Sequence, residues 1–286
     1  MPELPEVEVL VCRLAPRLKN KTIRRVEVRR PRVLRPTPAA ELKRALTGAH
    51  FVDLARRAKY LAFTLRRPGG GGTFLLIGHL GMTGRMFLQP ANAPLPKHTA
   101  VALNLGRENF VFEDTRYFGR LTLDTSTQEG LGPEPLSDEF TLEYFIRALK
   151  RSKQMIKVKL LDQSLVGGVG NIYACESLFH AGISPRLPAR KLTRAQTKRL
   201  RSALRKTLAE AIHFGSSVPL DWPGTGERDR LFYYGRAEGA PDYEERLCMY
   251  DRQGQPCPVC QAPIRRIVQA ARSTFYCPRC QRPQRP

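Results

Sequence analysis

The sequence predicts an α+β protein of several domains. Three observations support this prediction. Apolar residues alternate with polar ones over much of residues 22 to 124, they recur at helical spacing after residue 131, and four of the seven cysteines cluster near the C-terminus. With 286 residues the chain can bury the cores of two domains, so disulfides are not required for stability.

An amphipathic helix is predicted directly after Pro5, with Pro16 as the place for a bend. Glu6 and Glu8 fall in its first turn, where the helix dipole favours acidic side chains. Apolar residues at steps of three and four define its buried face, and these are Val7, Leu10, Val11, Leu14 and Leu18.

From about residue 22 to residue 124 the apolar period is two, as in 61–65 and 101–105. Glycine-containing segments at 69–72 and 106–109 separate such runs as turns. Many short strands without helices between them predict a β-sandwich or barrel for this part of the chain.

Glycine and proline in GLGPEPLSDEF place a domain boundary near residue 131, and residues 137–139 supply a helix-capping signal. The chain beyond this boundary is predicted to be helical, over 142–149, 156–162, 172–180 and 194–214. Residues 216–245 are rich in glycine, proline and aromatic side chains and are predicted to form a long loop.

The chain is strongly basic, with 48 Lys and Arg against 26 Asp and Glu, a net charge of +22. Such an excess indicates a polyanionic partner, and a generally basic surface is the alternative. The sequence contains no apolar run of the roughly 18 residues that a membrane span needs, and no signal-peptide pattern. We therefore expect a cytoplasmic protein with no membrane partner.

The C-terminal cysteines form two pairs, CPVC and CPRC, separated by sixteen residues. This spacing predicts a Zn²⁺ site made of Cys257, Cys260, Cys277 and Cys280. Four thiolate ligands leave no open position for a catalytic water, so we expect one structural zinc ion. The residues between the pairs are predicted to form a hairpin whose arginines, Arg265, Arg266 and Arg272, are candidates for phosphate contacts.

The segment VGGVGNIYACESL places a glycine-rich turn before a helix, with Asn171 at the expected N-cap. The free backbone N–H groups of such a helix start suit either ordinary capping or the binding of a phosphate.

The segments HLGMTGRM and EDTRYFGRL each place an apolar side chain and an arginine in a loop or at a strand end. Met82 and Phe118 could be core residues, or they could be wedges that enter the base stack of a bent DNA duplex. Arg116 could then fill the space left by an extruded base. Lys59 in RRAKYL taken alone is a solvated strand lysine.

The chain begins MPELPEVEV, and we expect removal of Met1 because the next residue is the small Pro2. Removal would leave a secondary amine beside the carboxylate of Glu3. An α-amine titrates near pH 8, so part of it is neutral and nucleophilic at physiological pH. Pro2 and Glu3 therefore indicate either a catalytic pair or the start of a helix.

The chain closely resembles bacterial formamidopyrimidine-DNA glycosylases, in the family that includes endonuclease VIII. Seven segments carry the resemblance, in this order: PELPEVE, RRAKYL, HLGMTG, DTRYFG, LGPEPLSDEF, VGGVGNIYACESLFHAGI and ARSTFYCPRC. The resemblance implies a catalytic β-sandwich over 1–130 and a helix-two-turn-helix domain over 131–245, whose loop at about 216–245 would recognise the lesion. A zinc finger over 246–286 would follow.

The resemblance also implies roles for single residues. Pro2 would attack C1′ of a damaged nucleotide and form a Schiff base, Glu3 would act as acid and base on the sugar side, and Lys59 would serve lesion-side and elimination chemistry. Arg272 would hold the phosphate near the lesion. The residues that match DNA-contacting positions are Met82, His98, Arg116, Phe118, Lys153, Lys157, Asn171 and Tyr173.

The implied activity is that of a monomeric, bifunctional glycosylase and lyase, which removes oxidised purines from double-stranded DNA and cleaves the strand by β,δ-elimination. The alternatives are a glycosylase for oxidised pyrimidines of the endonuclease VIII type, and a non-catalytic protein that binds damaged DNA. The sequence departs from the family pattern at Tyr117, where many relatives have a second basic residue, at Asp251, where glycine is usual, and in the longer segment at 216–250.

Overall fold

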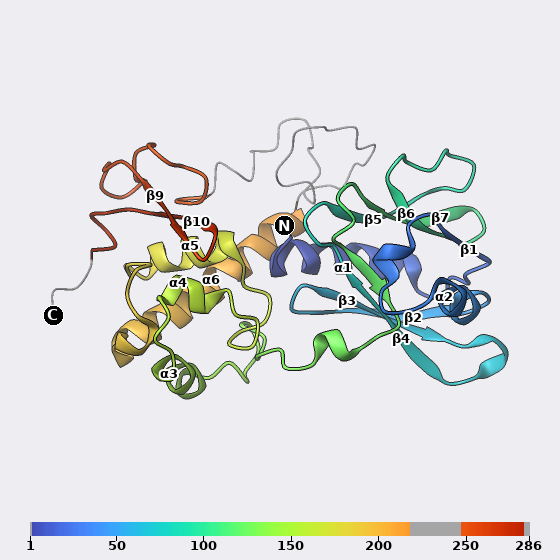
Figure 1. The fold of residues 1–286 in the computed structure, drawn as a ribbon, viewed down its shortest axis with the longest axis horizontal. Helices are drawn as coiled ribbons and strands as arrows, with labels where there is room; N and C mark the ends of the chain where they lie inside the picture. The colour runs from blue at the N-terminus through green and yellow to red at the C-terminus, as the bar shows by residue number, and fades with distance from the viewer. Residues whose placement is uncertain (1, 218–246, 283–286) are drawn as a thin grey trace. The chain divides into compact units, whose positions relative to one another are not determined.

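The computed structural model describes residues 2–217 and 247–282 and contains two compact units (Figure 1). The first unit comprises the residues up to 129 except 3–5, and the second comprises residues 3–5 and those from 130 onward. None of the helices in the described ranges has the length and apolar composition of a membrane span.

Helix α1 (Leu4–Leu18) confirms the helix predicted after Pro5, and Pro16 lies within its last turn. The predicted apolar face is buried, and Val9 is buried with it. Glu6 lies in the first turn of the helix, as its sequence position suggested.

The first unit contains two four-stranded antiparallel sheets (Figure 1). One sheet has the order β1 (Arg25–Val28), β6 (Thr99–Asn104), β7 (Glu108–Asp114) and β5 (Gly84–Pro90). The other has the order β2 (His50–Arg57), β3 (Tyr60–Arg66), β4 (Thr73–His79) and β8 (Arg120–Thr122).

Aromatic side chains from the two sheets meet in a shared core, which confirms a β-sandwich. The rings of Phe51 and Phe63 come from one sheet and pack on Phe110 of the other, at centroid distances of 6.4 and 5.6 Å. The predicted alternation in β3 is confirmed, because Leu61, Phe63 and Leu65 are all buried.

The prediction that no helix interrupts the strands is wrong. Helix α2 (Ala39–Leu46) lies between β1 and β2, and short 3-10 helices occur at Pro31–Leu34, Pro68–Gly70 and Ser126–Gln128. Helix α2 buries only Leu42 and Leu46, one helical turn apart. Two apolar residues give too short a periodic signal to separate a helix from a loop.

The second unit contains helices α3 (Leu142–Lys150), α4 (Ile156–Leu160), α5 (Asn171–His180) and α6 (Arg194–Ser217), with a 3-10 helix at Ala189–Lys191. All four predicted helices are present. The capping prediction at 137–139 is wrong, because the N-cap of α3 is Thr141, whose hydroxyl accepts the N–H of Tyr144. Helix α6 also includes residues 216 and 217 of the predicted loop, and the rest of that loop lies outside the described residues.

The cysteine-rich segment forms the predicted hairpin from β9 (Arg265–Gln269) and β10 (Arg272–Tyr276). This hairpin lies beside α5 (Figure 1). Cys175 and Phe179 of α5 share one apolar cluster with Met249, Ile264 and Phe275 of the cysteine-rich segment. The helical part and the hairpin therefore have a common core.

Candidate active site and nucleic-acid interface

The carboxylate of Glu3 is buried at the N-terminus of helix α5. It accepts hydrogen bonds from the backbone N–H groups of Gly170 and Ile172, both at 2.8 Å, and of Tyr173 at 3.3 Å. The start of a helix presents such donors together with the positive end of the helix dipole, so this position stabilises a negative charge.

The glycine-rich turn before α5 allows this close approach. A Cβ atom on Gly170 would lie 2.3 Å from Cδ of Glu3, and one on Gly168 would lie 2.7 Å from the side chain of Leu4. The prediction of Asn171 as the N-cap is wrong, because Gly170 occupies that position. The anion at this helix start is the chain's own Glu3 rather than a phosphate.

Lys157 lies in α4, and its charge interacts with that of Glu3 and with that of Arg272. Burial lowers the pKa of Lys157, the nearby Cys175 opposes that change, and the positive charge of Arg272 adds to it. The side chain has 0 % exposure, and its Nζ has no hydrogen-bond partner among the described residues. An unpaired buried ammonium is unfavourable unless an anion reaches it.

Arg272 is the first residue of β10 and is exposed, so its guanidinium is available to a ligand. Asn171 connects the start of α5 to the same strand, because its Nδ2 donates to the carbonyl of Ser273 at 2.9 Å. The structure thus brings Glu3, Lys157, Asn171 and Arg272 to one region of the second unit.

In the first unit, Pro2 is buried and Lys59 lies in the turn between β2 and β3. Lys59 is only 7 % exposed, so the view of it as a solvated strand lysine is wrong. The charge of Lys59 reaches His79, the last residue of β4.

His79 is a candidate site residue that our sequence analysis missed. Burial, together with the charges of Lys59 and Arg120, lowers its pKa to about 4. Its Nδ1 accepts the N–H of Gly81 at 3.1 Å, so the proton of the neutral ring is on Nε2, which can donate. In the sequence, His79 stands in HLGMTG, two residues before Gly81. The structure shows that Gly81 has a positive φ.

Met82, Arg116 and Phe118 lie on two loops that are fixed to each other. The carboxylate of Asp114 accepts the hydroxyl of Thr83 at 2.6 Å and the N–H groups of Arg116 at 3.1 Å and Gly119 at 2.8 Å. Met82 is 45 % exposed and Phe118 48 % exposed. Both side chains therefore project from the surface, and the alternative that they are core residues is wrong.

The remaining predicted DNA contacts differ in accessibility. Lys153 is exposed between α3 and α4, and His98 is partly exposed next to the end of β7, where its carbonyl accepts the N–H of Asp114. The side chain of Tyr173 is buried. Lys157 is likewise not a surface residue.

The four cysteine sulfurs form a cluster in which all lie within 4.8 Å of one another. The Sγ atoms of Cys257 and Cys280 are 3.9 Å apart, and those of Cys260 and Cys277 are 3.4 Å apart. Zn–S bonds of about 2.3 Å directed to the corners of a tetrahedron place sulfurs about 3.8 Å apart, so the cluster fits zinc. The N–H of Ala262 lowers the pKa of Cys260 to about 7.

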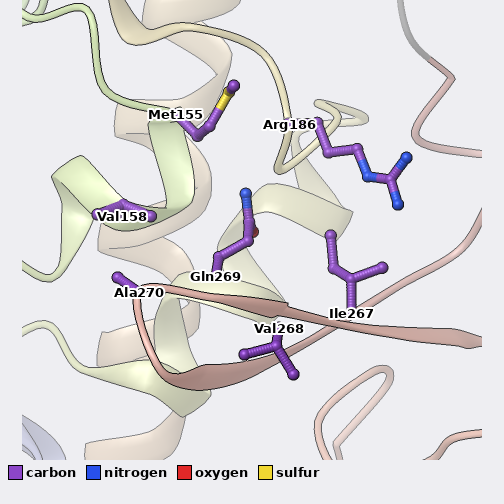
Figure 2. Close-up of a pocket in the computed structure, with 7 residues that line it drawn as sticks. All are labelled: Met155, Val158, Arg186, Ile267, Val268, Gln269 and Ala270. Carbon is purple, nitrogen blue, oxygen red and sulfur yellow. The ribbon is translucent and has the colours of Figure 1, made fainter.

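A separate cavity of about 430 Å³ lies between α4 and the hairpin. Figure 2 shows Met155 and Val158 on one side of it and Ile267 and Gln269 of β9 on the other. None of the predicted site residues lines this cavity.

Comparison with known proteins matches three family models along the chain. The formamidopyrimidine-DNA glycosylase N-terminal domain matches residues 1–121, the helix-two-turn-helix (H2TH) domain of formamidopyrimidine-DNA glycosylase matches residues 131–219, and a zinc finger found in formamidopyrimidine-DNA glycosylase and isoleucyl-tRNA synthetase matches residues 254–283.

Curated relatives and solved structures agree with these matches. The formamidopyrimidine-DNA glycosylase of Thermus thermophilus is 41 % identical over 292 residues, covering 98 % of each chain, and that of Carboxydothermus hydrogenoformans is 39 % identical over 282 residues, covering 99 % of this chain and 100 % of the relative. The Lactococcus lactis enzyme in complex with DNA containing N7-benzyl-Fapy-dG has a TM-score of 0.86 at 32 % identity, covering 99 % of this chain and 100 % of that one.

The two-sheet unit, the helical unit and the four-cysteine finger are thus those of a single family of DNA repair proteins. The chain belongs to the formamidopyrimidine-DNA glycosylase family.

Proposed function

We propose that this protein is a bifunctional DNA glycosylase and lyase that removes oxidised purines from double-stranded DNA. The observation that carries the proposal is the fixed position of Glu3 on helix α5, directly beside Pro2 in the chain. The family supports the substrate, because its solved complexes contain DNA with Fapy-dG or carbocyclic 8-oxo-G.

The proposed chemistry begins at the amine of Pro2 after removal of Met1. The nitrogen attacks C1′ of the damaged nucleotide, and the base leaves with the electrons of the glycosidic bond. The resulting Schiff base allows two successive eliminations, which break the 3′ and then the 5′ phosphate ester. Glu3, held by backbone N–H groups, transfers protons on the sugar side.

Positive groups assist this chemistry in the proposed mechanism. Arg272 holds the phosphate next to the lesion, and Lys59 serves the base and the elimination steps. Lys157, which is buried near Glu3 and Arg272, adds to the positive charge of this region without contacting DNA itself. His79, neutral and with its proton on Nε2, is a further donor for a phosphate oxygen.

The other contacts bend and hold the duplex. Met82 and Phe118 enter the base stack as wedges, and Arg116 fills the space of the extruded nucleotide. The surface residues that contact the DNA backbone in this proposal are His98, Lys153 and Asn171. We place these functions in a monomer with a catalytic domain at 1–130, a DNA-binding domain at 131–245 and a zinc finger at 246–286, which works in the cytoplasm on nucleoid DNA.

Borohydride trapping tests the reaction directly. Purified protein, with its N-terminus verified by mass spectrometry, is mixed with duplexes that carry 8-oxoguanine, an oxidised pyrimidine or an abasic site. We expect a covalent adduct that is strongest with 8-oxoguanine and weaker for Pro2→Gly. Preference for the pyrimidine would assign the protein to the endonuclease VIII type, and no adduct with any duplex would leave a non-catalytic DNA-binding relative.

Gly170→Ala tests the role of the helix start. Its Cβ would displace the carboxylate of Glu3, and a misplacement of about 1 Å can lower a rate by roughly 100-fold. We expect a loss of that order in trapping and strand cleavage. Gly72→Ala is the control, because Gly72, like Gly170, has no positive φ, but a Cβ there would meet open space. Equal activity of the two variants would contradict the proposed role of Glu3.

A further inference from the structure

Arg30 and Tyr117 form a pair beside the loop that carries Arg116 and Phe118. Nε of Arg30 donates to the hydroxyl of Tyr117 at 3.1 Å, and its guanidinium carbon lies 5.5 Å from the centre of the Tyr117 ring. At the next residue of this loop, Phe118, the ring centre lies 4.9 Å from the guanidinium carbon of Arg116. Two arginines are thus stacked on two rings of the same short loop.

The backbone on both sides of this pair is fixed. The N–H of Arg30 donates to the carbonyl of Ala100 in β6 at 3.1 Å. Tyr117 has a φ of +54°, a conformation that a bulky side chain rarely adopts, and the Asp114 hydrogen bonds hold the loop on both sides of it. A strained residue held in this way next to proposed DNA-contacting groups is typical of a functional site.

No carboxylate in the described part of the chain neutralises the charge of Arg30. Its Nη1 donates to the carbonyl of Arg29 at 3.1 Å, and among the described residues it has no acidic partner. Arg29, the preceding residue, is different, because its Nε is 2.6 Å from a carboxylate oxygen of Glu27. Arg30 therefore presents an exposed, oriented guanidinium with Nη2 available to an acceptor.

We propose that Arg30 contacts a phosphate of the DNA backbone and that Tyr117 positions it for that contact. The proposal rests on the function proposed above. Arg30, which follows strand β1, thus adds a second positive group beside Arg116 at this loop.

The test measures binding to a duplex with a tetrahydrofuran abasic analogue, by fluorescence anisotropy between about 50 and 200 mM salt. One lost phosphate contact should make the slope of log affinity against log salt shallower by about 0.9, so we expect this change for Arg30→Ala, with roughly tenfold weaker binding at low salt. Arg29→Ala is the matched control, since it removes the same charge from the neighbouring residue, and its slope should equal that of the wild type.

Tyr117→Phe tests the positioning role, because it removes the hydroxyl and keeps the ring. We expect weaker binding in the wild-type background and no added loss in the Arg30→Ala background, as required for two residues that act as one unit. Thermal unfolding verifies that each variant is folded.

A slope for Arg30→Ala equal to that of the wild type, or equal changes for Arg29→Ala and Arg30→Ala, would overturn the proposal for Arg30. An additive loss in the double variant would overturn the role of Tyr117. If wild-type protein failed to bind the duplex at all, the proposed function itself would be wrong.

Discussion

The protonation of His79 shows how the environment of one side chain determines its chemistry. The ring packs against Tyr60 at a centroid distance of 4.9 Å, and Lys59 and Arg120 place positive charge near it. Both the burial and these charges oppose protonation, so the ring stays neutral at pH 7. Only the neutral ring can accept the N–H of Gly81 at Nδ1 and still donate from Nε2.

This environment predicts a loss of stability in mild acid. The unfolded histidine binds a proton near pH 6.5 and the folded one only near pH 4, so stability is complete above pH 6.5 and falls as the pH decreases toward 4. The difference corresponds to at most about 3 kcal/mol. Urea unfolding at pH 7 and pH 4.5 should show a smaller acid loss for His79→Asn, whose amide oxygen replaces the Nδ1 acceptor without titrating. Equal acid losses for the two proteins, or an NMR titration of His79 with a midpoint above 6, would contradict this account.

At the scale of elements, the turn of the zinc-finger hairpin is strained. Ala270 and Ala271 join β9 to β10 and have φ values of +47° and +58°. A two-residue hairpin turn with both φ values positive favours Asn-Gly, because an alanine Cβ is unfavourable in that conformation. Arg272 follows this turn directly, so its position depends on the turn being formed.

Replacement of this turn by Asn-Gly should stabilise the finger. We expect Ala270→Asn combined with Ala271→Gly to raise its stability by about 1 kcal/mol, since the strain removed exceeds the entropy that glycine adds to the unfolded chain. The measurement is the temperature at which zinc is released to a chromophoric chelator. Ala271→Val, with a branched side chain at the same φ, should lower that temperature, and an unchanged temperature for the Asn-Gly variant would show that the turn is not strained.

The elements that the sequence predicted well are those with a strong local period. Helix α1, strand β3 and helix α6 each have several apolar residues at one spacing, and the cysteine spacing alone predicted the metal site. Helix α2 was missed because it buries only two side chains.

Contacts between distant residues were the part of the site that sequence analysis could not supply. Glu3 and Gly170 are 167 positions apart, and nothing local to either residue shows that the carboxylate occupies the helix start. The same is true of Arg30 and Tyr117, which are 87 positions apart. The motifs identified the groups that carry the chemistry, whereas tertiary packing determines which of them meet.

At the scale of the whole molecule, the finger and helix α5 form one structural unit. The carboxylate of Glu176, fully buried in α5, accepts the backbone N–H groups of Cys248, Met249 and Tyr250, all at 2.8 to 2.9 Å. Gln281, after the last cysteine, donates to the carbonyl of Ile183 at 2.9 Å. With the shared apolar cluster, these bonds connect the metal site to the helix that holds Glu3.

Removal of zinc should therefore disturb more than the finger. Without the metal the four cysteines lose the bonds that hold the hairpin together, because zinc binding and local folding are coupled. Hydrogen exchange of verified zinc-free protein should become faster in β9, β10 and α5, whereas β3 and β4, in the other compact unit, should be unchanged. DNA cleavage should fall with the loss of Arg272, and added zinc should restore both. Full cleavage without zinc, or fast exchange confined to the hairpin, would show that α5 keeps Glu3 in place without the finger.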